Sequence, residues 1–97
     1  MKYLVVDSLL NSTGIRDNYT GDYLEPENLH LSSTTIKRLE SWLLRYNSQY
    51  YEGYVDDEVV DKLDREGKEI ALIIKNELSD VKISYFSDAR MTKELIS

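Results

Sequence analysis

Cysteine is absent from the 97-residue sequence, which excludes a disulfide framework, thiolate metal ligands and a nucleophilic cysteine. Long apolar runs are absent as well, because no stretch approaches the roughly 20 apolar residues that a membrane-spanning helix needs. The apolar run at the N-terminus ends at Asp7, which makes it too short for the core of a signal peptide. We therefore expect one domain, residues 1–97, in the cytoplasm and without a membrane segment.

Basic residues are scarce relative to acidic ones. Twelve Lys and Arg side chains face eighteen Asp and Glu, and the formal net charge is −6. The nearest approach to a basic patch is Lys37 and Arg38, close to Glu40, so nucleic acid is not expected as a partner. The acidic balance has two interpretations. It keeps the protein in solution, or it favours a basic partner and speeds the encounter with it.

Motifs for catalysis are missing. The chain has no GxSxG sequence, and neither glycine-rich pattern for phosphate follows residues 2–7. The single histidine, His30, stands between two leucines, whereas a histidine base needs an orienting partner and a nucleophile within reach. We interpret His30 as a partly buried loop residue, and we expect no enzyme activity, no catalytic residue and no cofactor.

Carboxylates are dense in residues 56–67, but their spacing differs from that of a calcium-binding loop. We therefore expect no metal site. Asp57, Asp61 and Asp64 are spaced i, i+4 and i+7, so on a helix they share one face. This face is either a solvated surface interrupted by two bases or an acidic stripe that contacts a basic partner.

Two long segments have the period of amphipathic helices. In residues 33–51 the apolar positions follow steps of three and four, and Ser32 or Ser33 can cap the start. Gly53 ends this helix, and Asp56 or Asp57 caps a second one that extends to Ser79 and Asp80. Gly67 falls on the apolar face of the second helix, which indicates a close approach to the first.

The remaining periodic segments predict strands. Residues 2–7 form a continuous apolar run typical of a strand buried on both faces, and residues 81–86 alternate as a strand with one buried face. The polar tail after them has room for one more helical turn. The expected fold is α+β, in the order strand, loop, helix, helix, strand. An antiparallel helix pair would cover one face of a sheet of two or three strands.

Residues 12–33 have no period, yet they combine turn residues with spaced tyrosines and leucines. Such a composition favours an ordered surface loop over a flexible linker. A short strand at 22–25 is one candidate to pair with residues 2–7. The acids of this loop either satisfy turn amides or, together with its tyrosines, plug a cationic site on a partner. Arg16 is the only nearby base, and an internal pair with Asp17 is one expectation for it.

Tyrosine is enriched, with eight residues against one phenylalanine. The helical period assigns Tyr46 and Tyr50 to the core. Tyr51 and Tyr54 are freer to point outward, where tyrosine is useful in interfaces because it combines an apolar body with a polar tip.

Several short segments together resemble a known group of proteins: GIRD at 14–17, GDYLEPENLHLS at 21–32, SWLLRY at 41–46, LDREG at 63–67 and YFSDA at 85–89. The set is similar to small bacterial proteins of about this length that look like immunity proteins of contact-dependent growth inhibition and related polymorphic toxin loci. This resemblance implies a protein that binds a cognate toxin domain and blocks its active site. If the toxin is a nuclease, its site is basic because its substrate is a polyanion. No catalytic residue is carried over.

The leading hypothesis is therefore an immunity-type protein that neutralises a basic nuclease toxin domain by stoichiometric binding. The alternative is a regulatory or adaptor subunit of another bacterial complex, including a homodimer through an exposed strand edge. A metal-dependent hydrolase is a third. The sequence leaves the partner and the oligomeric state open. The expected partner-binding residues are Asp17, Tyr19, Asp22, Tyr23, Glu25, Tyr51, Tyr54, Asp57, Asp61 and Asp64.

Overall fold

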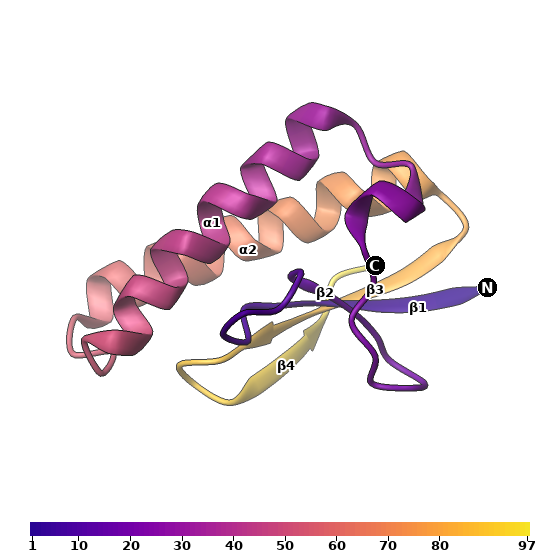
Figure 1. Cartoon of the computed structure of the whole chain (residues 1–97). Coiled ribbons are helices and arrows are strands. Elements are labelled where there is room, and N and C mark those ends of the chain that lie inside the picture. The colour runs from indigo at the N-terminus through magenta and orange to yellow at the C-terminus, as the bar shows by residue number, and fades with distance from the viewer.

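The computed structural model describes residues 1–97 and places two helices on one face of a four-stranded sheet (Figure 1). The α+β class and the order of the predicted elements are confirmed, whereas the sheet has four strands instead of two or three. The elements are β1 (Lys2–Asp7), β2 (Ile15–Asp17), the 3-10 helix η1 (Pro26–Leu29), α1 (Ser33–Tyr51), α2 (Asp57–Leu78), β3 (Val81–Ser87) and β4 (Thr92–Leu95).

The sheet is mixed, with the strand order β2-β1-β3-β4. The central strands β1 and β3 run parallel, with Leu4 beside Ile83 and Val6 beside Tyr85. A parallel pair needs a long crossover connection, and the helix pair α1–α2 supplies it. The continuous apolar run of β1 follows from this central place, because Leu4 and Val5 point to opposite faces of the sheet and both are fully buried.

Both edge strands differ from the sequence prediction. The strand that pairs with β1 is Ile15–Asp17, and residues 22–25 contribute only a single bridge from Tyr23 to Arg16. The polar tail forms β4, antiparallel to β3, instead of a helical turn. The physical reason is the same in both places. An edge strand can form because the backbone of the neighbouring strand needs hydrogen-bond partners. Backbone pairing does not require a pattern of apolar side chains, so a short edge strand has no apolar period by which the sequence could predict it.

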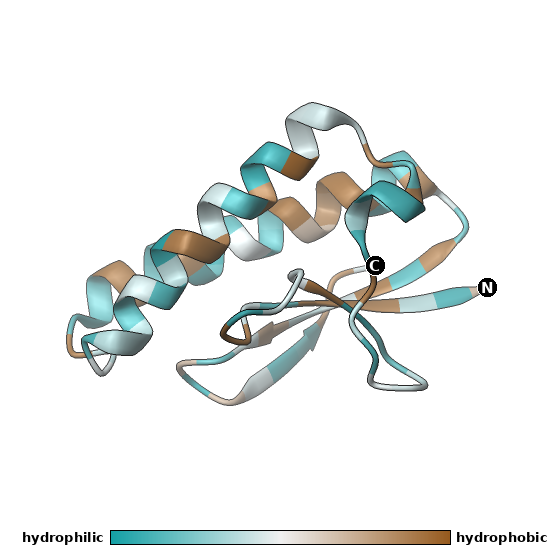
Figure 2. Ribbon diagram, in the orientation of Figure 1, coloured by the Kyte–Doolittle hydropathy of each residue, from teal (hydrophilic) through white to brown (hydrophobic).

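Both long helices have the predicted bounds. The Ser32 side chain accepts from the Thr35 amide at the start of α1, and the Asp56 side chain accepts from the Val59 amide at the start of α2. The helices run antiparallel, and the most hydrophobic helical stretch is the C-terminal half of α2 (Figure 2). Neither helix is long and apolar enough to cross a membrane.

The core lies between the helices and the central strands. Trp42 and Tyr46 are fully buried there, which confirms the assignment of Tyr46. The assignment of Tyr50 to the core is wrong, because its side chain is 47% exposed. The helix pair extends beyond the sheet at the α1–α2 turn (Figure 1), so Tyr50 follows the helical period but has no strand beneath it.

Candidate partner-binding surfaces

The loop after β2 is ordered, and its acids have different roles. The Asp17 carboxylate accepts hydrogen bonds from the amides of Tyr19 (2.7 Å) and Thr20 (3.2 Å), so it satisfies the turn. Asp22 is exposed, and its carboxylate makes no hydrogen bond or ion pair. The expected pairing of Arg16 with Asp17 is wrong, because Arg16 pairs with Asp7 at 3.2 Å.

Asp7 is a buried carboxylate at the end of β1 that sequence reasoning missed. It accepts from the Leu9 amide (3.0 Å), from Arg16 Nε (3.2 Å) and from the Tyr23 hydroxyl (2.9 Å). Tyr23 is therefore turned inward, and burial together with Asp7 raises the pKa of its hydroxyl. An aspartate that ends an apolar strand was the only signal in the sequence. The contacts tie the loop to the sheet and leave Tyr23 little freedom to meet a partner.

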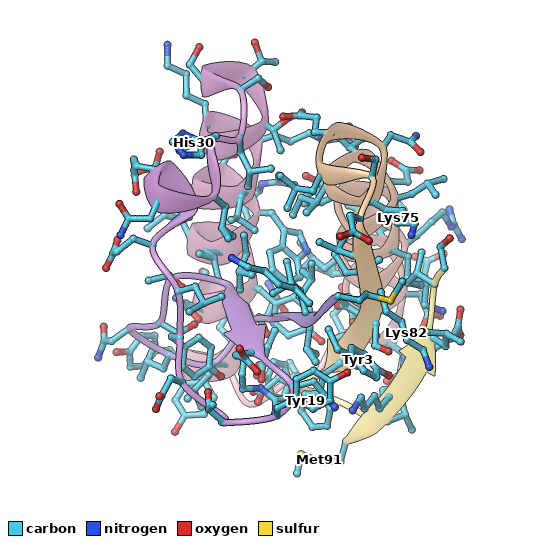
Figure 3. The ribbon with its side chains drawn as sticks, turned by 90° about the vertical axis from the view of Figure 1, so that its right-hand side faces the viewer. Tyr3, Tyr19, His30, Lys75, Lys82 and Met91 are labelled. Atoms are coloured by element: carbon cyan, nitrogen blue, oxygen red, sulfur yellow. The ribbon has the colours of Figure 1, made fainter.

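Tyr19 is the most exposed of the predicted loop tyrosines, at 71%. Its ring lies against the ring of Tyr3, edge to face, with centroids 6.1 Å apart. The two rings lie below the sheet, away from the helices (Figure 3). The Lys82 and Lys93 ammonium groups lie 5.1 and 5.2 Å from the Tyr3 ring centroid. This face of the sheet therefore carries positive charge next to aromatic rings.

At the start of α2, Asp57, Asp61 and Asp64 share one helix face, as their spacing indicates. All three surround one guanidinium, that of Arg90 in the turn between β3 and β4. The nitrogen–oxygen distances are 3.8, 2.6 and 4.0 Å. The hydrogen bond that the Arg90 guanidinium donates to the Asp61 carboxylate raises the pKa of Arg90. The acidic stripe is thus partly neutralised within the chain, so it is a weaker attraction for a basic partner than the sequence suggested.

Asp64 is the buried end of this stripe, only 8% exposed. Its oxygens accept from the hydroxyls of Tyr46 (2.8 Å), Tyr85 (2.6 Å) and Ser87 (2.8 Å). These bonds connect α1, α2 and β3 at one point. Asp64 is therefore placed to hold the fold together, and its carboxylate is not presented to a partner.

The two tyrosines of the α1–α2 connection differ. Tyr51 is 74% exposed. Tyr54 packs against Tyr46 with ring centroids 5.9 Å apart, and its hydroxyl donates to Asp88 at 2.5 Å. Burial and then Asp88 raise the pKa of Tyr54. Tyr51 is the freer of the two, and its ring contacts that of Tyr50 with centroids 5.6 Å apart.

The expected partner-binding residues do not form one surface. The loop that carries Asp17 to Glu25 follows the edge strand β2, and the α1–α2 turn lies at the far end of the helix pair (Figure 1). A partner that covered both groups would have to span the length of α1. Along that helix the structure shows a surface that sequence reasoning missed.

This surface is a groove beside α1. Two adjoining hollows share Ser12, Glu40 and Leu43 as lining residues, so together they follow the helix. We define the α1 groove by the six residues that carry its charge and apolar area: Glu25, Glu27, Ile36, Glu40, Leu43 and Leu44. The signal in the sequence was weak, because Leu44 sits outside the buried period and the three glutamates are far apart in the chain.

The single histidine differs from its interpretation as a partly buried residue. His30 is exposed, and it follows η1 in the left-handed conformation with φ 61°. Leu29 and Leu31 on either side are buried, so they fix the backbone while the imidazole points away from the molecule (Figure 3). No group of three or more His, Asp or Glu side chains is arranged to hold a metal ion.

Alkaline pH is expected to destabilise the protein through four tyrosines: Tyr23, Tyr46, Tyr54 and Tyr85. Burial is the largest cause that raises each pKa, to about 12 for Tyr46. The folded state then holds these protons more tightly than the unfolded chain, in which tyrosine has a pKa of about 10. Their stabilising contribution is therefore complete below about pH 10 and is lost as the pH rises further.

The measurement is the free energy of unfolding between about pH 8 and pH 12, followed together with tyrosinate absorbance. We expect stability to fall across the alkaline half of this range, with the last tyrosinates appearing in the same step as loss of the fold. A stability that remains constant there would show that the buried hydroxyls ionise freely.

Comparison of the chain with protein-family models, with curated proteins and with solved structures found no match. The arrangement of residues described above is therefore the basis for any functional conclusion.

Proposed function

We propose that this chain is an immunity-type protein that binds a cognate basic toxin domain, a nuclease in the leading case, stoichiometrically and in the cytoplasm. The observation that carries the proposal is a set of exposed acids without an ion-pair partner in the ordered segment after β2. Arg16, Arg38 and Arg45 each pair with an acid of the chain itself. The exposed acids Asp22, Glu25 and Glu27 have no such partner.

Unpaired carboxylates on an ordered loop favour a basic partner for two reasons. The field of a net charge of −6 raises the rate at which a positively charged protein arrives. An ordered loop also loses little conformational freedom when it binds. The positively charged substrate site of a nuclease is a surface of this kind, and covering it would stop turnover without any reaction by the inhibitor.

The test is co-expression with the basic domain encoded by the neighbouring upstream reading frame. Cells that carry this chain are expected to survive expression of that domain, and the purified proteins are expected to form a one-to-one complex. Its association rate should fall with added salt, because exposed charges are screened within about 10 Å at 0.1 M salt. Continued toxicity and no complex would reject the proposal.

The rival function, a homodimeric adaptor subunit, has one observation in its favour. The four residues of β4 are all exposed at the edge of the sheet, and a free edge can pair with a second copy. Sedimentation of the purified chain separates the two proposals. A stable dimer that ignores the basic domain would favour the adaptor.

A further inference from the structure

We infer that the α1 groove is the docking site for a basic, amphipathic segment of the partner protein. The inference rests on the proposed function and adds to it the surface used and the chemistry of the segment that occupies it. It differs from the sequence hypothesis, which placed the contact on the loop at residues 17–25 and on the start of α2. Of those residues, only Glu25 lines the groove.

The groove has apolar area that nothing in the chain covers. Ile36 is half-buried and Leu43 is buried, while Leu44 beside them is 73% exposed. Tyr51 follows Leu44 by seven residues, so it lies on the same side of α1 two turns further along. A leucine and a tyrosine exposed in line on one helix face provide the apolar contact that a partner segment can bury.

Two of the three basic residues of α1 face α2, and the third, Lys37, is exposed and has no ion-pair partner. Arg38 and Arg45 both point toward α2, where they pair with Glu69 at 2.8 Å and Glu66 at 2.6 Å. The bond between Arg45 and Glu66 raises the pKa of the arginine and lowers that of the glutamate, so both stay charged and paired. The arginines are thus turned away from the groove.

On the groove side the helix and the loop present acids. Glu25, Glu27 and Glu40 are all exposed, and none of them lies within ion-pair distance of a base. An apolar floor with an acidic rim matches a segment with apolar residues on one side and Lys or Arg on the other. Nucleic acid and anionic membrane surfaces carry the wrong charge for this rim.

The groove walls are held in place before any partner binds. Gly14 sits so close to α1 that a Cβ atom on it would lie 3.0 Å from one Leu39 methyl and 3.1 Å from one Leu43 methyl. On the other wall, Pro26 and Leu29 of η1 are buried. A preformed groove reduces the entropy lost on binding, and this favours its use as a recognition surface.

The experiment uses the full chain and a synthetic peptide with leucines at helical spacing and lysines on the opposite face. A second peptide, with glutamates in place of the lysines, is the control. Amide chemical shifts are recorded by NMR as each peptide is added. We expect saturable shifts confined to residues 11–13, 25–27 and 36–51 with the lysine peptide, and none with the glutamate peptide.

Two variants locate the contact. The double variant Glu25→Lys/Glu40→Lys is expected to weaken peptide binding about tenfold or more, because two rim attractions become repulsions. Glu58→Lys/Asp80→Lys changes the net charge by the same amount at exposed, unpaired positions away from the groove, and we expect nearly wild-type affinity. Leu44→Ala leaves the charge unchanged and should weaken binding several-fold through loss of apolar contact.

The outcomes separate this inference from the proposed function. Equal loss of affinity in both double variants, or shifts centred on the sheet face near Tyr3, would overturn the groove as the site. So would dimerisation of the chain through α1, because the groove would then be occupied by a second copy.

If the wild type protects cells and Glu25→Lys/Glu40→Lys protects them equally, the proposed function stands and the groove is wrong as the docking site. If neither the wild type nor the double variant protects cells but the lysine peptide still binds in the groove, the proposed immunity function is rejected and the docking site remains.

Discussion

Replacing Asp64 with alanine is expected to lower the free energy of unfolding by about 3–5 kcal/mol, the typical cost of removing one partner from a buried charged network. The carboxylate accepts hydrogen bonds from Tyr46, Tyr85 and Ser87. Without it these buried hydroxyls lose their common acceptor, and an unsatisfied buried polar group is costly. Urea denaturation followed by circular dichroism measures the loss.

Two other substitutions make this prediction sharp. Asp61→Ala removes an exposed carboxylate whose partner is Arg90, and an exposed ion pair is worth about 0–1 kcal/mol. Asp64→Asn keeps the shape and one acceptor oxygen, so its cost should fall between the other two. If Asp64→Ala proves no more destabilising than Asp61→Ala, the hydroxyl network does not stabilise the fold.

Gly67→Ala is expected to destabilise the protein by about 2–3 kcal/mol, although alanine is the better helix former by about 1 kcal/mol. A Cβ atom at this position would lie 2.2 Å from Tyr85 Cε1 and 2.8 Å from Trp42 Cζ2. Neither ring can move easily, because the Tyr85 hydroxyl is bonded to Asp64 and the Trp42 indole donates to the Leu63 carbonyl at 2.8 Å. For a domain of this size the melting temperature should fall by roughly 10–20 °C.

Asn76→Ala on the exposed side of the same helix is the matched control, and helix propensity alone should leave stability equal or slightly higher there. A double-mutant cycle then tests the cause. In a Tyr85→Val background the Cε1 atom is gone, so Gly67→Ala should cost less than it does in the wild type. A gain in stability from Gly67→Ala alone would contradict the close packing of helix and strand.

The helices were predicted well because their signals are local. The cap at Ser32, the break at Gly53 and the cap at Asp56 lie at the ends of clear apolar periods, and each acts through neighbouring backbone groups. The sequence predicted a close approach of α1 at Gly67, and Trp42 of α1 does lie close to this glycine. The structure adds that Tyr85 of β3 approaches the same glycine more closely than Trp42 of α1 does.

The candidate site was predicted less completely, because exposure and pairing depend on distant segments. Tyr19 and Tyr51 are exposed, while Tyr23 and Tyr54 donate to Asp7 and Asp88. No local pattern in the sequence distinguishes the two exposed tyrosines from the two whose hydroxyls are bonded. The α1 groove was missed because its walls come from three segments that meet only when the chain is folded.

By itself the sequence determined the α+β class, both helices with their caps, the two central strands and the excess of negative charge, because these follow from composition and local period. Only the tertiary structure decided which acids remain free. Asp7 meets the hydroxyl of Tyr23, 16 residues away, and Asp64 meets that of Ser87, 23 residues away. Pairing at such separations depends on how the strands and helices pack, so the surface that a basic partner would meet is a property of the folded chain.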